Sequence, residues 1–184
     1  MYSSARCFRP AAALLTGAFL LSTVGCGSSS APPLATVDEV ELDRFMGDWR
    51  VVGLIPNRIE KNAHDSVESY RLRPDGKIDI TYTFRDGSFD APEKTLNMVA
   101  RIKDQKTNAE WRVRPMWPLS LQYLVTDLAD DYRYTVVAHP SRNYVWIMAR
   151  EAQLADEDWQ AILSRLEGQG FDLDRIVRVP HQAG

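Results

Sequence analysis

Cysteine and histidine are scarce in this 184-residue chain, which has two cysteines and three histidines. Cys7 lies near the amino terminus, so a chain that loses a leader keeps Cys26 alone and has no internal disulfide. His64, His139 and His181 are far apart and show no spacing typical of metal ligands. A Gly-x-Ser-x-Gly elbow and a phosphate-cradling glycine loop are also missing. The sequence therefore predicts no metal, no cofactor and no catalytic residue, and hence a protein that is not an enzyme.

The chain also lacks an excess of positive charge and a long hydrophobic run. It has 22 Lys and Arg residues against 25 Asp and Glu residues, a formal net charge of −3. A surface that binds DNA or RNA needs the opposite balance, which excludes nucleic acid as a partner. The apolar run AAALLTGAFLL at residues 11–21 is too short to cross a bilayer, because a spanning helix takes about 20 apolar residues.

The start of the chain is similar to a bacterial lipoprotein signal peptide. Arg6 and Arg9 precede the short apolar run, and small residues lead to Cys26. The stretch LSTVGC resembles a lipobox, in which the cysteine is acylated, although Thr23 stands where leucine is usual. An ordinary signal peptide cut nearby is the alternative. The resemblance implies lipidation of Cys26, and Gly27 after it favours the outer membrane, with the protein facing the periplasm.

Composition divides the chain into three parts. We expect a lipoprotein signal peptide at residues 1–25, a lipid-anchored flexible tether at 26–40 and one domain at 41–184. Glycine, serine and proline are frequent in the tether, as in linkers without fixed structure. The sequence does not set the oligomeric state, so a homodimer stays open beside a monomer.

Short apolar segments and turn residues alternate through most of the domain. In KIDITYTF, Ile78, Ile80, Tyr82 and Phe84 share one face, and charged or hydroxyl side chains share the other. The preceding RPDG predicts a hairpin turn. Eight strands are expected in this way, at residues 48–55, 66–72, 77–84, 94–102, 109–115, 121–128, 132–139 and 143–150.

A helical pattern follows the last of these strands. Four apolar residues from Trp159 to Leu166 are spaced as on one helix face, which predicts a helix over 155–171 that begins with acids and ends at glycine. A last short strand is expected over 175–180. An all-β fold of eight antiparallel strands loses both sheet edges when it closes into an up-and-down barrel, with the helix on its flank. A two-sheet sandwich is the alternative.

Three residues at the two ends of the strand region resemble a lipocalin feature. Gly47 and Trp49 open the first strand and Arg150 closes the eighth. In lipocalins such an arginine covers the tryptophan at the closed end of the barrel, which is a cation–π contact. YVWIMAR at 144–150, with the helix and strand after it, resembles bacterial outer-membrane lipocalins related to apolipoprotein D. The resemblance covers about residues 42–180 and implies structural roles for Gly47, Trp49 and Arg150.

The resemblance also implies a ligand, because lipocalins typically bind hydrophobic small molecules. A fatty acid or a lysophospholipid-like molecule would be held for storage, transport or envelope maintenance. Inward aromatic and apolar side chains would line the cavity. The candidate ligand-binding residues are Tyr82, Phe84, Trp111, Tyr123, Tyr134, Trp146 and Met148.

Two alternatives to simple ligand binding stay open. The first is a lipocalin-like enzyme acting on a bound lipid, which needs an inward carboxylate or histidine that no strand clearly supplies. The second is a structural envelope lipoprotein whose barrel is filled by its own side chains.

Overall fold

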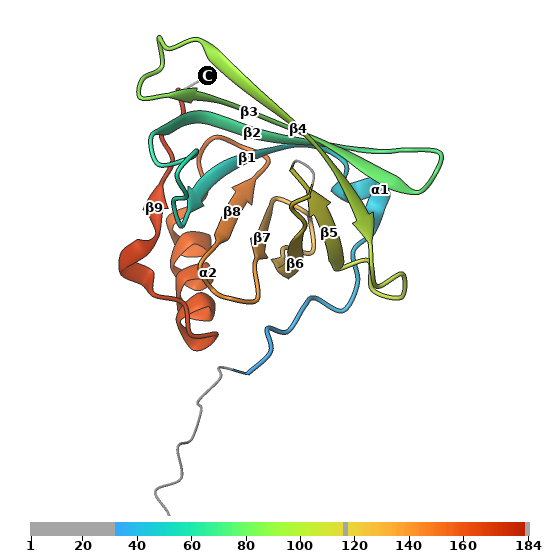
Figure 1. Ribbon diagram of the computed structural model, residues 1–184. Coiled ribbons are helices and arrows are strands. Elements are labelled where there is room, and N and C mark those ends of the chain that lie inside the picture. Colours follow the sequence, from blue (N-terminus) through green and yellow to red (C-terminus); the bar gives the residue numbers. More distant parts are fainter. Residues whose placement is uncertain (1–31, 116–117, 183–184) are drawn as a thin grey trace, which may run out of the picture. The chain divides into compact units, whose positions relative to one another are not determined.

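The computed structural model describes residues 32–115 and 118–182 of the chain. The predicted leader and Cys26 lie outside these residues. The described part is a β-barrel with one long helix beside it (Figure 1). In this part of the chain no helix is both long and apolar enough to span a membrane.

The described residues form nine strands and three helical elements. The strands are β1 (Gly47–Leu54), β2 (Ala63–Leu72), β3 (Lys77–Asp86), β4 (Glu93–Ile102), β5 (Glu110–Arg114), β6 (Leu121–Leu128), β7 (Tyr134–Ala138), β8 (Val145–Ala149) and β9 (Val177–Arg178). The helical elements are α1 (Leu42–Phe45), α2 (Asp156–Gly168) and the 3₁₀ helix η1 (Leu173–Arg175).

The first eight strands form one closed antiparallel barrel. Each strand from β2 to β7 pairs with the next, and β1 pairs with both β2 and β8, which closes the sheet. β9 adds to β1 as a short extra strand, with Val177 opposite Leu54. Closure confirms the predicted barrel and excludes the sandwich, which would leave sheet edges unpaired.

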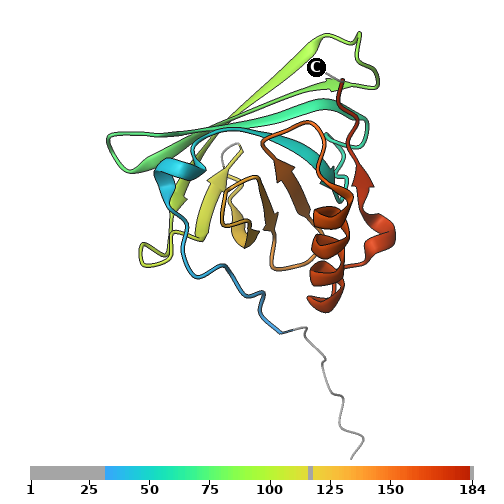
Figure 2. The ribbon, with the colours of Figure 1, turned by 180° about the vertical axis from the view of Figure 1, so that it is seen from behind.

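Two apolar clusters lie on opposite faces of the barrel wall. The inner cluster fills the barrel and includes Trp49 and Ile80. The outer cluster lies between the wall and α2 and includes Ile147 of β8 and Ile162 of the helix. Both ribbon views show α2 against the outside of the barrel (Figures 1 and 2). Because β7 is covered on both faces, all five of its residues are buried.

Gly53 of β1 lets α2 approach the wall closely. A Cβ atom at this position would lie only 2.6 Å from a ring carbon of Trp159. Arg178 also packs on this indole, with its guanidinium carbon 4.0 Å from the ring centroid. Gly170, two residues after the helix, has a φ of +83°, which agrees with the predicted glycine stop.

Residues 32–40, which we call the N-terminal strap, are packed against the barrel. Leu34 is buried in the outer cluster and Val40 in the inner one. The amide of Val37 donates to the carbonyl of Val125 at 3.0 Å. The expectation of a flexible tether is therefore wrong for residues 32–40. Leu34, Val37 and Val40, three positions apart, pack against the apolar clusters of the barrel.

Several strands begin at other residues than predicted, and β2 and β7 are among those that differ by two residues or more. β2 begins earlier, at Ala63, because a bulge after His64, with Asp65 at a φ of +48°, extends the pairing with β3. β7 begins later, at Tyr134, because Tyr132 has a φ of +61° and belongs to the preceding turn.

Candidate functional site

The up-and-down order places alternate connections at opposite ends of the barrel. The closed end is covered by α1 and has the connections 73–76, 103–109 and 129–133. The open end is surrounded by the loops 55–62, 87–92 and 139–144 and by the described residues 115 and 118–120 between β5 and β6.

The inner face of the barrel becomes more exposed towards the open end. On β4, the pairing with β3 directs Lys94, Leu96, Met98 and Ala100 inwards, in order from the open end. The first two are exposed, Met98 is half-buried and Ala100 is buried. Leu96 is 37% exposed, and Leu121 at the same end of β6 is 36% exposed. Solvent therefore reaches the interior from the open end.

Aromatic side chains seal the closed end. Phe45 of α1 packs against Trp49 and Trp111, with centroid distances of 5.1 and 5.4 Å. The indole nitrogen of Trp49 donates to the carbonyl of Phe45 at 2.7 Å. All three side chains are fully buried, so they form a floor beneath the interior.

Arg150 covers this floor from outside. Its guanidinium carbon lies 3.8 Å from the centroid of the Trp49 ring. Nη1 donates to the carbonyl of Asp48 at 2.8 Å, and Nη2 donates to the carbonyl of Arg44 at 2.6 Å. Gly47 has a φ of +92°, and a Cβ atom there would lie 3.5 Å from Nη1 of Arg150. Because 3.5 Å is an ordinary contact distance, glycine is favoured here by the positive φ of the bend into β1 and not by lack of space.

A series of stacked rings rises from the floor towards the open end. Trp111 stacks on Tyr123 with centroids 5.3 Å apart and planes 8° apart. Tyr123 stacks on Trp146 at 6.4 Å, and Trp146 stacks on Tyr144 at 6.2 Å. Flat aromatic faces at successive depths offer apolar contact along the length of a chain-like ligand.

Two carboxyl groups face the interior, and sequence reasoning missed both. Glu68 lies on the inner face of β2 and is 5% exposed, and Glu60 lies in an open-end loop and is 7% exposed. The hydroxyl of Tyr70 donates to Oε2 of Glu68 and also shares a hydrogen bond with the hydroxyl of Tyr123. Glu68 is therefore part of a buried network that joins β2 to β6.

A tight turn directs Glu60 into the barrel. Oδ1 of Asn57 accepts hydrogen bonds from the amides of Ile59 and Glu60, at 2.8 and 3.1 Å. The side-chain amide of Asn57 donates to Glu60, and Nε1 of Trp146 donates to Oε1 of Glu60 at 3.0 Å. The loop thereby carries an acid to the inner face of β8.

Burial raises the pKa of both carboxyl groups. Loss of solvation is the main cause, and the charge of Glu60 adds to the shift at Glu68, whose pKa rises to about 7. Burial also raises the pKa of Tyr70 and Tyr123 far above the ordinary value, so both keep their protons. Among the inward residues of the described strands, Lys94 at the open end is the only cation. The middle of the barrel thus offers carboxyl and hydroxyl groups.

Metal ligation has no support in the described part of the chain. No three His, Cys, Asp or Glu side chains gather there in a way that could hold a metal ion.

Six of the seven predicted ligand-binding side chains lie inside the barrel, five of them in the inner cluster and Trp146 packed against it. They lie at different depths, with Trp111 in the floor and Tyr82 and Phe84 stacked 5.1 Å apart on β3. The six are Tyr82, Phe84, Trp111, Tyr123, Trp146 and Met148.

The expectation that Tyr134 faces the interior is wrong. Tyr134 lies in the outer cluster, where its hydroxyl accepts a hydrogen bond from Nη2 of Arg165 of α2 at 2.9 Å. Strand alternation could not reveal this, because β7 is apolar on both faces.

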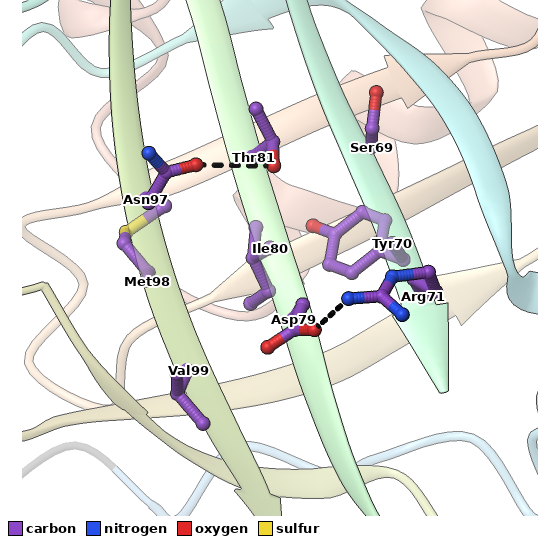
Figure 3. A pocket seen from close by; sticks show the side chains of 9 residues that line it. All are labelled: Ser69, Tyr70, Arg71, Asp79, Ile80, Thr81, Asn97, Met98 and Val99. Atoms are coloured by element: carbon purple, nitrogen blue, oxygen red, sulfur yellow. Dashed lines mark hydrogen bonds and ion pairs between the residues drawn. The ribbon is translucent and has the colours of Figure 1, made fainter. Parts of the chain in front are cut away.

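A hollow of about 500 Å³ on the outer face of β2, β3 and β4 is a second candidate site (Figure 3). Arg71 forms an ion pair with Asp79, and Oγ1 of Thr81 donates to Oδ1 of Asn97 at 3.3 Å. These polar groups satisfy one another, as is common on a solvated sheet face. We therefore place the functional site inside the barrel.

Comparisons with known proteins show the family and the fold of the chain. Residues 40–181 match the family model described as a lipocalin-like domain. Outer membrane lipoprotein Blc of Escherichia coli K12 is 29% identical over 174 residues, covering 92% of this chain and 95% of that protein. Temperature-induced lipocalin-1 of Arabidopsis thaliana is 27% identical over 153 residues, covering 80% and 82%. Insecticyanin of the tobacco hornworm Manduca sexta has a TM-score of 0.65 at 14% identity, covering 83% and 86%, which is a likeness of fold.

Proposed function

The chain belongs to the lipocalin-like family, and from this premise we propose that its barrel binds one amphipathic lipid, a fatty acid or a lysophospholipid. The exposure of inward residues carries the proposal, because Leu96 and Leu121 meet solvent while Trp49 and Trp111 are sealed. A barrel that is open at one end and lined by rings takes an elongated apolar chain end-on. Burial of that chain contributes about 0.8 kcal/mol per CH₂ group. Storage, transport and envelope maintenance are the roles that such binding serves.

The interior carboxyl groups favour a lysophospholipid over a fatty acid. A fatty-acid carboxylate beside Glu68 would add a third acid to a region that already holds Glu60. A lysophospholipid brings a glycerol hydroxyl, which can donate to a carboxylate, and an ester carbonyl, which can accept from a tyrosine. Its phosphate would stay at the open end, within reach of Lys94.

Anchoring to the outer membrane belongs to the same proposal. Relatives from Citrobacter freundii, Escherichia coli and Vibrio cholerae bear the name outer membrane lipoprotein. Together with the lipobox resemblance, these names support acylation of Cys26 and a domain that faces the periplasm.

Tryptophan fluorescence tests the ligand class. Trp111 belongs to the inner cluster and Trp146 packs against it, so a bound chain should change their emission. We expect lysophosphatidylethanolamine to saturate at one molecule per barrel, and a fatty acid of the same length to bind more weakly at pH 7.5.

A pair of neighbouring variants supplies the control. Leu96→Asp places a charge on the inner face and should weaken binding, whereas Thr95→Asp places it on the outer face and should not. Failure of both lipids to bind, or equal loss in the two variants, would overturn the proposal.

Glu68 favours a second candidate function, catalysis on a bound lipid. A carboxyl group with a pKa of about 7 can give or take a proton near neutral pH. Mass spectrometry of lysophospholipid incubated with the protein distinguishes the two functions. A product that is lost in Glu68→Gln would indicate an enzyme, and unchanged ligand would indicate binding alone.

A further inference from the structure

We propose that the open end of the barrel docks on a lipid surface, so that the ligand passes between bilayer and interior without crossing water. The inference rests on the proposed function, because docking would serve the exchange of the bound lipid. The contact itself follows from exposed apolar side chains, charge and the course of the N-terminal strap.

Large apolar side chains that face solvent gather at the open end. Ile59 is 53% exposed in the loop between β1 and β2, and Leu119 is 54% exposed in the loop between β5 and β6. Leu96 and Leu121 lie just inside the same opening, and we call these four residues the apolar rim. Single exposed apolar side chains are ordinary, but four around one opening form a surface suited to an apolar partner.

The charges of the open-end loops fit an anionic headgroup layer. These loops carry Arg58, Lys61 and Arg142 against Glu60 and Asp90. Glu60 is buried inside the barrel, so it does not oppose the exposed cations beside it. Lysine and arginine next to apolar side chains can reach lipid phosphates while their neighbours enter the acyl boundary. This local balance differs from that of the whole chain, whose formal net charge is −3.

The N-terminal strap leads from the closed end to the open end. At one end of the strap, the amide of Val40 donates to the carbonyl of Thr107, in a closed-end loop, at 2.7 Å. At the other end, the carbonyl of Pro32 accepts from Nη2 of Arg142, in an open-end loop, at 2.5 Å. In Figure 1 this blue segment runs away from α1 along the barrel.

The length of chain before the strap limits where an anchor can be. Cys26 is six positions before Pro32. Six extended residues span at most about 22 Å, since each covers at most about 3.6 Å. An acyl group on Cys26 would therefore hold the apolar rim, and not the closed end, beside the bilayer.

Fluorophores at single cysteines test which end touches lipid. Cys7→Ser and Cys26→Ser remove both native cysteines from the full chain, and Leu119→Cys or Asp75→Cys then places an NBD label at the open or the closed end. Vesicles of phosphatidylethanolamine and phosphatidylglycerol are added. We expect a blue shift, and quenching by nitroxide-labelled lipids, for the label at position 119 alone. An equal response at both positions, a response at 75 alone, or none at either would overturn the docking proposal.

Transfer kinetics separate docking from ligand binding. Ile59→Ser combined with Leu119→Ser should slow the transfer of a fluorescent lysophospholipid to vesicles severalfold and abolish its dependence on vesicle concentration. Val177→Ser, which removes an exposed apolar side chain from β9, is the matched control and should have no effect. Equal rates in all variants would contradict docking while leaving the proposed function intact. Failure of every variant, and of the unmodified chain, to bind the lysophospholipid would instead contradict the proposed function.

Discussion

Arg150, directly after β8, contacts the start of β1. Its guanidinium lies over the ring of Trp49 and donates to backbone carbonyls where α1 leads into β1. The ring centroid is 3.8 Å from the guanidinium carbon, and Nη2 lies within 3.3 Å of the carbonyl oxygens of Arg44, Phe45 and Met46. The last strand of the barrel is thus joined to the segment that precedes the first strand.

Arg150→Ala should lower the free energy of unfolding by roughly 0.5–2 kcal/mol, the range of a partly desolvated cation–π contact. A double-mutant cycle with Trp49→Leu, measured by urea denaturation, should show coupling of similar size. Arg71→Ala is the control, because its side chain is 75% exposed and its ion pair with Asp79 should contribute less than about 1 kcal/mol. Additive effects of the two substitutions would show that Trp49 and Arg150 do not stabilise the fold through their contact.

Gly53→Ala should destabilise the fold by roughly 1–3 kcal/mol, because the new methyl group overlaps the ring of Trp159. Trp159→Leu in the same chain should recover part of the loss by making room. Gly168→Ala is the matched control, since no atom lies within 4 Å of its Cβ position. Thermal or urea unfolding checks all three variants, and equal stability of the two alanine variants would contradict the close approach of α2.

Stability should fall as pH rises from about 5 to about 7. The pKa of Glu68 is about 7 in the folded barrel, above its ordinary value of 4.5, so the folded state holds more protons in that window. At 1.36 kcal/mol per pKa unit, the loss amounts to about 3 kcal/mol and is complete above pH 7. Urea denaturation between pH 5 and 8 should show this slope, and Glu68→Gln should reduce it, with the remainder due to Glu60. An identical slope in the variant would contradict the buried position of Glu68.

Cys26→Ser should move the protein from the membrane fraction to the soluble fraction after a high-salt wash. Acylation at this position would supply the anchor, and serine cannot take its place. Cys7→Ser, within the predicted leader, is the control and should leave the protein in the membrane fraction. A Cys26→Ser protein that stays in washed membranes would refute the lipobox interpretation.

Strands and the inward direction of their side chains could be predicted where one face of the strand is exposed to solvent. β3 alternates between buried and less buried residues along its length, as Ile78 and Ile80 indicate. β7 could not be predicted in this way, because α2 covers its outer face and both faces are apolar. The inward direction of Tyr134 was therefore predicted wrongly, although the strand itself was found.

The interior acids were hidden for two different reasons. In SVESYRL, Glu68 shares a face with Tyr70 and Leu72, and those large side chains were the available signal that the face is buried. The outward residues include Val67, which made the two faces look alike. Glu60 lies in a loop, and its hydrogen-bond partner inside the barrel, Trp146, is 86 positions away and brought close only by folding.

Native mass spectrometry of the protein purified from its own cells, with extraction and identification of any bound lipid, tests the lipid-binding claim most directly. We expect one lysophospholipid or fatty acid per barrel, retained by Thr95→Asp and lost from Leu96→Asp. A folded barrel that carries no lipid, and takes up none when lysophospholipid is added, would contradict the claim and indicate a barrel filled by its own side chains.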